Sequence, residues 1–213
     1  MNPPDLRLIV ITDSRHAGSR GIVDTVRAAL AGGAPAIQLR DKDATPRQLA
    51  ELARTLLPMT RAARALLFVN DRLDIALTSD ADGVHLGPDD IPLSAARALA
   101  PAPFLIGCSA DDPARARALE RQGASYIGCG AVFGTATKDV GGERIGIARL
   151  EEVVRAVTIP VIAIGGVNAT NIGVVAPTGA AGAAVVSAVM AAPQPRAATA
   201  GLLRGWEVGR LGG

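Results

Sequence analysis

The chain has 213 residues, of which 49% are hydrophobic and 20% are charged, and this composition excludes a long disordered segment and favours one folded domain over residues 1–213. Its 22 basic and 20 acidic residues leave a net charge of only +2 without any basic run, so nucleic acid is not an expected partner. No membrane partner is expected either, because the most apolar stretch, residues 180–192, is shorter than the roughly 18 residues that cross a bilayer.

Short runs rich in Val, Ile and Leu alternate with longer segments of helical period along the whole chain. The expected strands are residues 6–12, 36–40, 65–70, 83–86, 104–108, 126–130, 161–164 and 183–187. The expected helices are residues 22–31, 45–63, 71–78, 92–98, 111–122, 147–156, 170–176 and 188–204. Eight such units with nearly continuous apolar strands predict the α/β class and a single (β/α)₈ TIM barrel. The last helix could pack on the barrel or on another subunit, which leaves a homo-oligomer open.

The chain start and the two cysteines favour a cytoplasmic protein. The first residues lead directly into an apolar segment, without the basic and apolar regions of a secretion signal. Cys108 and Cys129 lie in apolar segments and lack metal-ligand spacing. We therefore expect both to be reduced thiols packed in the core.

Polar residues occur at the predicted C-terminal ends of seven strands. In a TIM barrel these ends and the loops that follow them carry the functional groups. In chain order the candidates are Gln38, Arg40, Lys42, Asn70, Asp71, His85, Asp90, Ser109, Thr135, Thr137, Lys138, Gly165, Gly166 and Ser187. We therefore expect one site at this rim of the barrel.

Several of these residue types suit phosphate groups. Arginine and lysine supply charge, hydroxyls donate hydrogen bonds, and glycine exposes backbone N–H groups to an oxyanion. The Gly165-Gly166 pair after the seventh strand and Ser187 after the eighth occupy the customary phosphate site of such barrels. The pair could also simply form a tight turn, but the hydroxyl predicted beside it favours phosphate binding.

Asp71 and Asp90 follow adjacent strands, so their carboxylates are expected close to each other and to the cations. Two carboxylates beside a phosphate site favour Mg²⁺ as the cofactor. Alternatively, Asp71 caps the next helix, and Asp90 forms part of a cap before the one after it. Spacing alone does not decide between these interpretations.

No Ser-His-Asp or Cys-His arrangement is evident among the candidates. His85 is expected to be a hydrogen-bonded residue of the rim rather than a general base. A site rich in cations and poor in bases suits the departure of a phosphate-type leaving group, since charge stabilisation does most of the work there.

The ordered motifs Q-L-R-D-K, N-D-R, A-D-G-V-H-L-G-P-D-D, I-G-C-S, T-A-T-K, A-I-G-G-V and A-V-V-S-A resemble those of the thiamine phosphate synthase family. They extend from the second to the eighth predicted strand. Each motif is weak alone, but the ordered set is specific. The resemblance implies a transferase whose small-molecule substrates are 4-amino-2-methyl-5-(diphosphooxymethyl)pyrimidine and a thiazole phosphate, and whose products are thiamine phosphate and pyrophosphate.

The resemblance also implies a role for each matching residue. Gln38 contacts the aminopyrimidine, and Mg²⁺ is held by Asp71 and Asp90. The pyrophosphate is surrounded by Arg40, Lys42, Asn70, Ser109 and Lys138, of which all but Asn70 are expected to be catalytic. The thiazole phosphate contacts Thr135, Thr137, Gly166, Val186 and Ser187. The family's reaction is dissociative: pyrophosphate leaves, and the neutral thiazole nitrogen captures the pyrimidine-methyl cation.

Departures and rival functions qualify this resemblance. Gly134 and Ala136 replace prolines that are frequent in the family, which leaves their loop less rigid, and the glycine-rich segment 138–146 is expected to act as a mobile lid.

A thiazole tautomerase of the same fold does not need the full pyrophosphate and metal set retained here. A phosphosugar epimerase or isomerase needs a paired acid and base. A non-catalytic binder of thiamine precursors is the remaining alternative.

Overall fold

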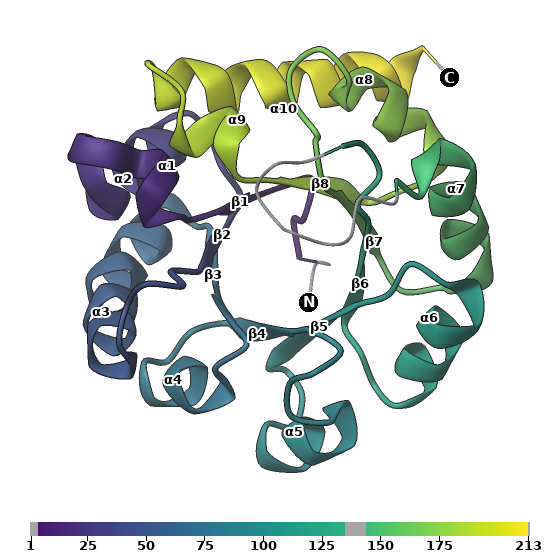
Figure 1. The fold of residues 1–213 in the computed structure, drawn as a ribbon, viewed down its shortest axis with the longest axis horizontal. Coiled ribbons are helices and arrows are strands. Elements are labelled where there is room, and N and C mark those ends of the chain that lie inside the picture. Colours follow the sequence, from purple (N-terminus) through teal and green to yellow (C-terminus); the bar gives the residue numbers. More distant parts are fainter. Residues whose placement is uncertain (1–3, 135–143, 213) are drawn as a thin grey trace.

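The computed structural model describes residues 4–134 and 144–212. Eight parallel strands close into a barrel in which each strand pairs with its neighbours in chain order and β8 pairs with β1 (Figure 1). The strands are β1 (Leu8–Ile11), β2 (Ala36–Leu39), β3 (Leu66–Asn70), β4 (Gly83–Leu86), β5 (Leu105–Ser109), β6 (Tyr126–Cys129), β7 (Val161–Ile164) and β8 (Gly182–Val185). The predicted (β/α)₈ TIM barrel is therefore confirmed.

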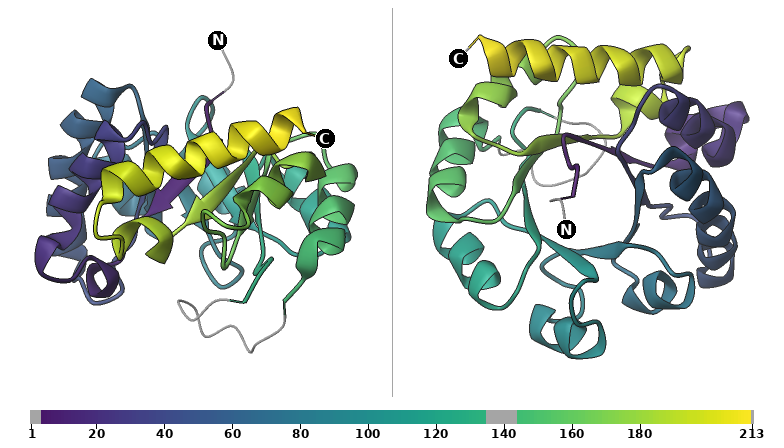
Figure 2. Two further views of the ribbon diagram at one scale, coloured as in Figure 1. Left: turned by 90° about the horizontal axis from the view of Figure 1, so that it is seen from above. Right: turned by 180° about the vertical axis from the view of Figure 1, so that it is seen from behind.

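Helices form a layer around the outside of the barrel, as both views in Figure 2 show. They are α1 (Ser14–Ala17), α2 (Gly21–Ala31), α3 (Pro46–Ala63), α4 (Leu73–Thr78), α5 (Leu93–Leu99), α6 (Pro113–Arg121), α7 (Gly146–Ala156), α8 (Ile172–Val175), α9 (Ser187–Met190) and α10 (Pro195–Leu211), with short 3₁₀ turns at Gly18–Arg20 and Ala176–Thr178. Local sequence fixes several starts. In α3, for example, Thr45 and Gln48 form a capping box around Pro46.

The prediction of a single helix over residues 188–204 is wrong. The chain instead forms α9 and α10, separated by residues 191–194. Pro193 lies in this gap and Pro195 starts α10. Proline lacks a backbone N–H and clashes with the preceding turn, so one helix cannot continue through both positions. Strand β8 is also shorter than predicted: it ends at Val185, and Ser187 is the first residue of α9.

Alternating side chains of the strands divide the interior into two layers. Outward-facing residues such as Val10, Leu39 and Val84 pack against the helices in the larger core. Inward-facing residues form a smaller cluster inside the barrel, where Phe68 and Tyr126 supply the largest side chains. Both faces of the sheet are therefore buried, as the apolar strands predicted. The polar groups of the candidate site lie at the carboxyl ends of the strands.

Helix α10 lies along the outside of this chain's own barrel, beside α2 and α8 (Figure 1). Of the two arrangements considered for the last helix, the structure shows packing on the barrel. Both cysteines are buried free thiols, as predicted. Within residues 4–134 and 144–212, no helix has the length and apolar character needed to cross a membrane.

Candidate active site

A pocket of about 810 Å³ lies at the carboxyl ends of the strands. All eight strands contribute to its lining, from Ile9 and Ile11 of β1 to Ala184 and Val185 of β8. Nine of the residues that were given a substrate or metal role line it: Gln38, Arg40, Lys42, Asn70, Asp71, Ser109, Gly166, Val186 and Ser187. The candidates His85 and Gly165 line it as well. Barrel closure thus brings together groups that are far apart in the sequence.

The end of β1 fixes Arg40 beside this pocket. The Thr12 hydroxyl accepts a hydrogen bond from the Arg40 backbone N–H at 2.8 Å and donates one to its carbonyl oxygen at 2.8 Å. The Asp13 carboxylate is 3.3 Å from the Arg40 guanidinium, and both side chains are nearly buried. Backbone and side chain of Arg40 are therefore held by one neighbouring segment, which sequence reasoning missed.

Asp13 also pairs with His16, another residue that lines the pocket and was not predicted. His16 Nδ1 lies 3.0 Å from the Asp13 carboxylate, which also accepts a hydrogen bond from the His16 backbone N–H. Burial by itself would raise the pKa of Asp13, but the hydrogen bonds of His16 and the charges of His16 and Arg40 together lower it. Asp13 is therefore a carboxylate that neutralises part of the positive charge at this edge.

His85 lies between two hydroxyls inside the barrel mouth. Its Nδ1 is 3.0 Å from the Tyr126 hydroxyl oxygen, and its Nε2 is 3.0 Å from Ser109 Oγ. Both ring nitrogens are thus engaged, in agreement with the prediction of a hydrogen-bonded rim residue. Burial raises the pKa of Tyr126 well above its ordinary value, so this residue stays a neutral phenol.

The two predicted metal ligands occupy different settings. Asp71 lines the pocket, has a positive φ of 63°, and donates its backbone N–H to the carbonyl oxygen of His85. Asp90 is not part of the lining, and its carboxylate accepts a hydrogen bond of 2.6 Å from Gly87 N–H. No cluster of three or more His, Cys, Asp or Glu side chains suited to a metal occurs in the described part of the chain.

The alternative interpretation of both aspartates as helix caps is wrong. The N-cap position of α4 is occupied by Arg72, whose side chain makes no capping hydrogen bond. Asp71 lies one residue before this N-cap position. The residue before α5 is Pro92, two positions beyond Asp90. A left-handed aspartate at the pocket wall is uncommon backbone geometry of a kind that clusters at functional sites.

The opposite wall is built from backbone. Gly165 and Gly166 have φ values of 92° and 70°, and a side chain on Gly166 would lie 2.4 Å from the carbonyl oxygen of Gly134. Asn168 and Asn171 donate side-chain hydrogen bonds to the Gly166 carbonyl. The turn is therefore held by two asparagine side chains, of which Asn168 also lines the pocket, and glycine is required for both the conformation of the turn and its close approach to Gly134.

Three predicted residues, Thr135, Thr137 and Lys138, lie outside the described residues, as does most of the segment 138–146. Sequence reasoning also missed Arg115 of α6, which adds a cation to the lining. A signal for Arg115 existed, since it follows β5 by one short loop that ends at the helix-capping Asp112.

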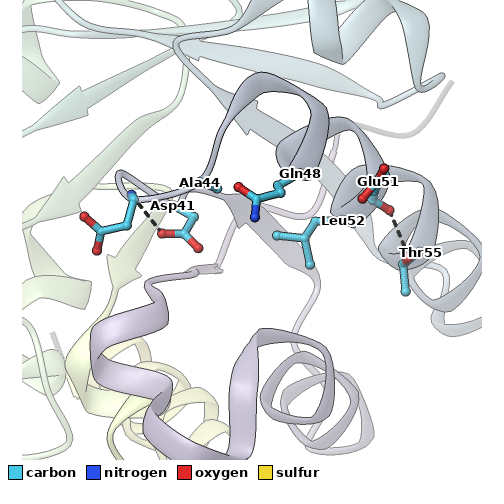
Figure 3. A pocket seen from close by; sticks show the side chains of 7 residues that line it. Asp41, Ala44, Gln48, Glu51, Leu52 and Thr55 are labelled. Atoms are coloured by element: carbon cyan, nitrogen blue, oxygen red, sulfur yellow. Dashed lines mark hydrogen bonds between the residues drawn. The ribbon is translucent and has the colours of Figure 1, made fainter.

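A second hollow of about 350 Å³ lies outside the barrel mouth, against α3 (Figure 3). Its lining includes the carboxylates Asp41, Asp43 and Glu51 and no Lys or Arg. Arg15 forms an ion pair with Asp43 from one side. An acidic, open surface of this kind does not suit a phosphate, so the central pocket is the candidate site.

A closed barrel with cations and a glycine turn at its C-terminal rim defines the class of TIM-barrel enzymes that bind phosphorylated small molecules. Within this class, residues 8–189 match the family model described as thiamine monophosphate synthase. The chain belongs to this family. The family members named thiamine-phosphate synthase are transferases.

Relatives and solved structures agree with that assignment. A thiamine-phosphate synthase of Roseiflexus castenholzii is 49% identical over 91% of this chain and 85% of its own length. One from Pyrococcus furiosus is 47% identical over 91% of both chains. The solved structure of a thiamine phosphate pyrophosphorylase from Pyrococcus furiosus has a TM-score of 0.89, with 45% identity over 96% of this chain and 97% of that one. A 3-hexulose-6-phosphate synthase, at 21% identity and a TM-score of 0.68 over 93% and 99% of the chains, shares the fold alone.

Proposed function

We propose that this chain joins 4-amino-2-methyl-5-(diphosphooxymethyl)pyrimidine to a thiazole phosphate, giving thiamine phosphate and pyrophosphate in a dissociative substitution assisted by Mg²⁺. The observation that carries the proposal is the convergence of nine residues with a predicted substrate or metal role on one pocket. Its volume of about 810 Å³ lies within the usual range for a small-molecule site. Family membership supplies the substrates.

The pyrophosphate is bound on the side of the pocket formed by β2 to β5. Arg40, fixed by Thr12 and Asp13, offers a rigid fork of donors, and Lys42 adds a mobile charge. Asn70 and Ser109 at the ends of β3 and β5 contribute further hydrogen bonds. As the bond between the pyrimidine methylene carbon and the pyrophosphate oxygen breaks, these groups stabilise the negative charge that develops on the leaving oxygen.

Asp71 and Asp90 would hold Mg²⁺ in this site. Two carboxylates fit an ion that keeps several water molecules and substrate oxygens in its coordination shell, and Mg²⁺ commonly binds in this way. When bound, the ion neutralises charge on the pyrophosphate. The left-handed backbone of Asp71 at the pocket wall supports its assignment, and Asp90 lies beside the lining residue Gly87, from which its carboxylate accepts a hydrogen bond.

The thiazole phosphate is bound on the opposite side. Its phosphate rests against Gly166, Val186 and Ser187, with the Ser187 hydroxyl as a side-chain donor. Thr135 and Thr137 keep their proposed role toward this substrate, and Lys138 its role toward the pyrophosphate. The attacking thiazole nitrogen carries no proton, so its bond to the methylene carbon forms without a general base. The proposed reaction therefore needs no acid and base pair, and a hydrogen-bonded His85 beside two metal-binding carboxylates is compatible with it. A phosphosugar isomerase does need such a pair, so that function is disfavoured.

We also propose that the protein works in the cytoplasm. The two buried free thiols support this location, since an oxidising compartment favours disulfides.

The proposal is tested by mixing the purified protein with both precursors and Mg²⁺, then quantifying thiamine phosphate and pyrophosphate. Equal amounts of both products are expected. Reactions that omit either precursor should yield no thiamine phosphate. A thiazole tautomerase would convert a thiazole isomer without the pyrimidine, and a binder would retain both precursors and release no pyrophosphate. Either of those outcomes rejects the proposed reaction.

A further inference from the structure

A line of polar groups crosses the mouth of the barrel from β2 to β5. It begins at Gln38, which is only 3% exposed and lies beside the hydroxyl of Tyr126. It continues from Tyr126 to His85 Nδ1 at 3.0 Å and from His85 Nε2 to Ser109 Oγ at 3.0 Å. Gln38, His85 and Ser109 all line the pocket, and Ser109 lies at its polar side.

The strands that carry these groups make room for the two rings. A side chain on Gly107 of β5 would place its Cβ 2.0 Å from Tyr126 Cζ and 2.4 Å from the hydroxyl oxygen. A side chain on Gly128 of β6 would place its Cβ 2.9 Å from His85 Cε1. Tyr126 is further held edge-to-face against Phe68, with ring centroids 5.5 Å apart. The two rings are therefore confined to one arrangement.

The hydrogen bonds of this line have a direction. Tyr126 is only 1% exposed, and a buried phenol needs an acceptor for its proton. The single proton of the phenol is then directed at His85 Nδ1. With Nδ1 as an acceptor, the ring proton lies on Nε2 and is donated to Ser109 Oγ. The hydrogen of the Ser109 hydroxyl is left to point away from His85.

We propose that Tyr126 and His85 form a directed hydrogen-bond chain that orients the Ser109 hydroxyl as a donor to a pyrophosphate oxygen in the pocket. Tyr126 is then a positioning residue for an anion that it does not touch. The identity of this anion rests on the proposed function. Without the chain, the hydroxyl hydrogen of Ser109 could instead be directed at His85 Nε2, and Ser109 would present only lone pairs to an anion.

The direction of the chain is tested by side-chain ¹⁵N NMR at pH 8, without any turnover. The sequence has only two histidines, and His16→Gln identifies the signals of His85. We expect a proton on His85 Nε2 and none on Nδ1. Any proton on Nδ1 overturns the proposal, because Tyr126 could not then donate to that nitrogen. This readout remains available if a Tyr126 variant fails to fold.

The consequence for the anion is tested by titrating pyrophosphate with Mg²⁺ into four proteins: the unaltered chain, Tyr126→Phe, Ser109→Ala and the double variant. Tyr126→Phe keeps the ring against Phe68 but removes the phenol oxygen. It should raise the dissociation constant of pyrophosphate about three- to tenfold, and Ser109→Ala should raise it by at least as much. The double variant should equal Ser109→Ala, because Tyr126 acts only through Ser109.

Thr25→Val is the matched control, since Thr25 is a buried residue of α2 whose hydroxyl donates to Gly21 O and is not part of the pocket lining. It should leave pyrophosphate affinity unchanged. An unchanged affinity in Tyr126→Phe, or losses that multiply in the double variant, would overturn the proposal. If coupling is found but no thiamine phosphate forms in the product assay, only the proposed reaction fails.

Discussion

The β2 to β5 side of the pocket carries cations and other polar side chains, whereas the β6 to β8 side presents glycines, backbone and apolar side chains, with Ser187 just beyond β8. On the first side, Arg40 and His85 are each fixed by two or more hydrogen bonds. On the second, the carbonyl oxygen of Gly166 accepts hydrogen bonds from the side chains of Asn168 and Asn171. Under the proposed function, one pocket recognises two anions by different means.

The comparison also predicts different sensitivities. A side chain that supplies charge can be removed without changing the backbone, so its loss should affect binding and turnover while leaving the fold intact. A glycine turn cannot be changed without moving the chain, so the second side is best tested through the hydroxyl of Ser187. The following predictions run from the largest expected effect to the smallest.

Arg40→Ala should have the largest effect, because it removes the most firmly fixed cation from the polar side. We expect kcat/KM for the pyrimidine substrate to fall by about 10²- to 10³-fold, comparable to the loss of one oxyanion donor in other enzymes. Initial rates measure this, with Arg61→Ala as the control, since Arg61 contacts Asp80 away from the pocket. Activity within threefold of the unaltered protein would mean that Arg40 does not act on the pyrimidine substrate.

Asp71→Asn and Asp90→Asn should each reduce turnover and raise the Mg²⁺ concentration needed for half-maximal rate. We expect at least the roughly 10- to 100-fold loss seen when a partner of a metal ligand is removed. Rates measured against Mg²⁺ concentration check this. Asp74→Asn is the control, because Asp74 is an exposed partner of Arg72. Full activity of both site variants at limiting Mg²⁺ would reject the metal assignment.

Ser187→Ala should affect only the backbone-built side. A lost hydrogen bond to a charged group is worth roughly 1.5–3 kcal/mol, so the dissociation constant of the thiazole phosphate should rise about tenfold to a hundredfold. Binding of the pyrimidine pyrophosphate should barely change. Separate titrations of the two ligands decide the matter. Equal losses for both would indicate general damage, and no loss for either would mean that the phosphate lies elsewhere.

Asp13→Asn should have the smallest effect, because it leaves Arg40 in place and removes only a neighbouring charge. We expect KM for the pyrimidine substrate to change by about two- to fivefold, or roughly 0.4–1 kcal/mol, because the contact is long at 3.3 Å and Thr12 still fixes the Arg40 backbone. An unchanged KM, with a twofold change ruled out by replicate measurements, would mean that Asp13 does not help to position Arg40.

Acid unfolding gives a second measure of Asp13. The pKa of Asp13 is lower in the folded protein than its ordinary value of 3.8, so its carboxylate stabilises the fold above that pH. This stabilisation is lost as the pH falls through the lower folded value. The unaltered protein should therefore exceed Asp13→Asn in stability at pH 6, and the difference should shrink toward pH 2. A constant difference over this range would contradict the linkage.

The fold could be predicted because each unit carries the same local signal: an apolar strand, then a helix of clear period. The break between α9 and α10 was missed because the alanine-rich pattern continues through it, although Pro193 and Pro195 mark the interruption. Strand ends also located part of the rim, although Asp90 does not line the pocket and Thr135, Thr137 and Lys138 lie outside the described residues. Nine of the residues that were given a substrate or metal role line the pocket because the register of a closed parallel barrel brings all strand ends to one side.

Contacts made only by barrel closure could not be predicted. Asp13 and Arg40 are far apart in sequence, and nothing local marks them as partners until β1 pairs with β2. Tyr126 was assigned to an apolar strand, and its alternation alone does not show that its hydroxyl meets His85. The left-handed conformation of Asp71 likewise depends on its hydrogen bond to the neighbouring strand.

The most direct test of the two-sided pocket is a crystal structure of the protein with Mg²⁺, pyrophosphate and the thiazole phosphate bound together. The account predicts pyrophosphate in contact with Arg40 and Ser109, and the thiazole phosphate against Gly166 and Ser187. Both anions bound to the same side, or the thiazole phosphate bound outside the pocket, would contradict it.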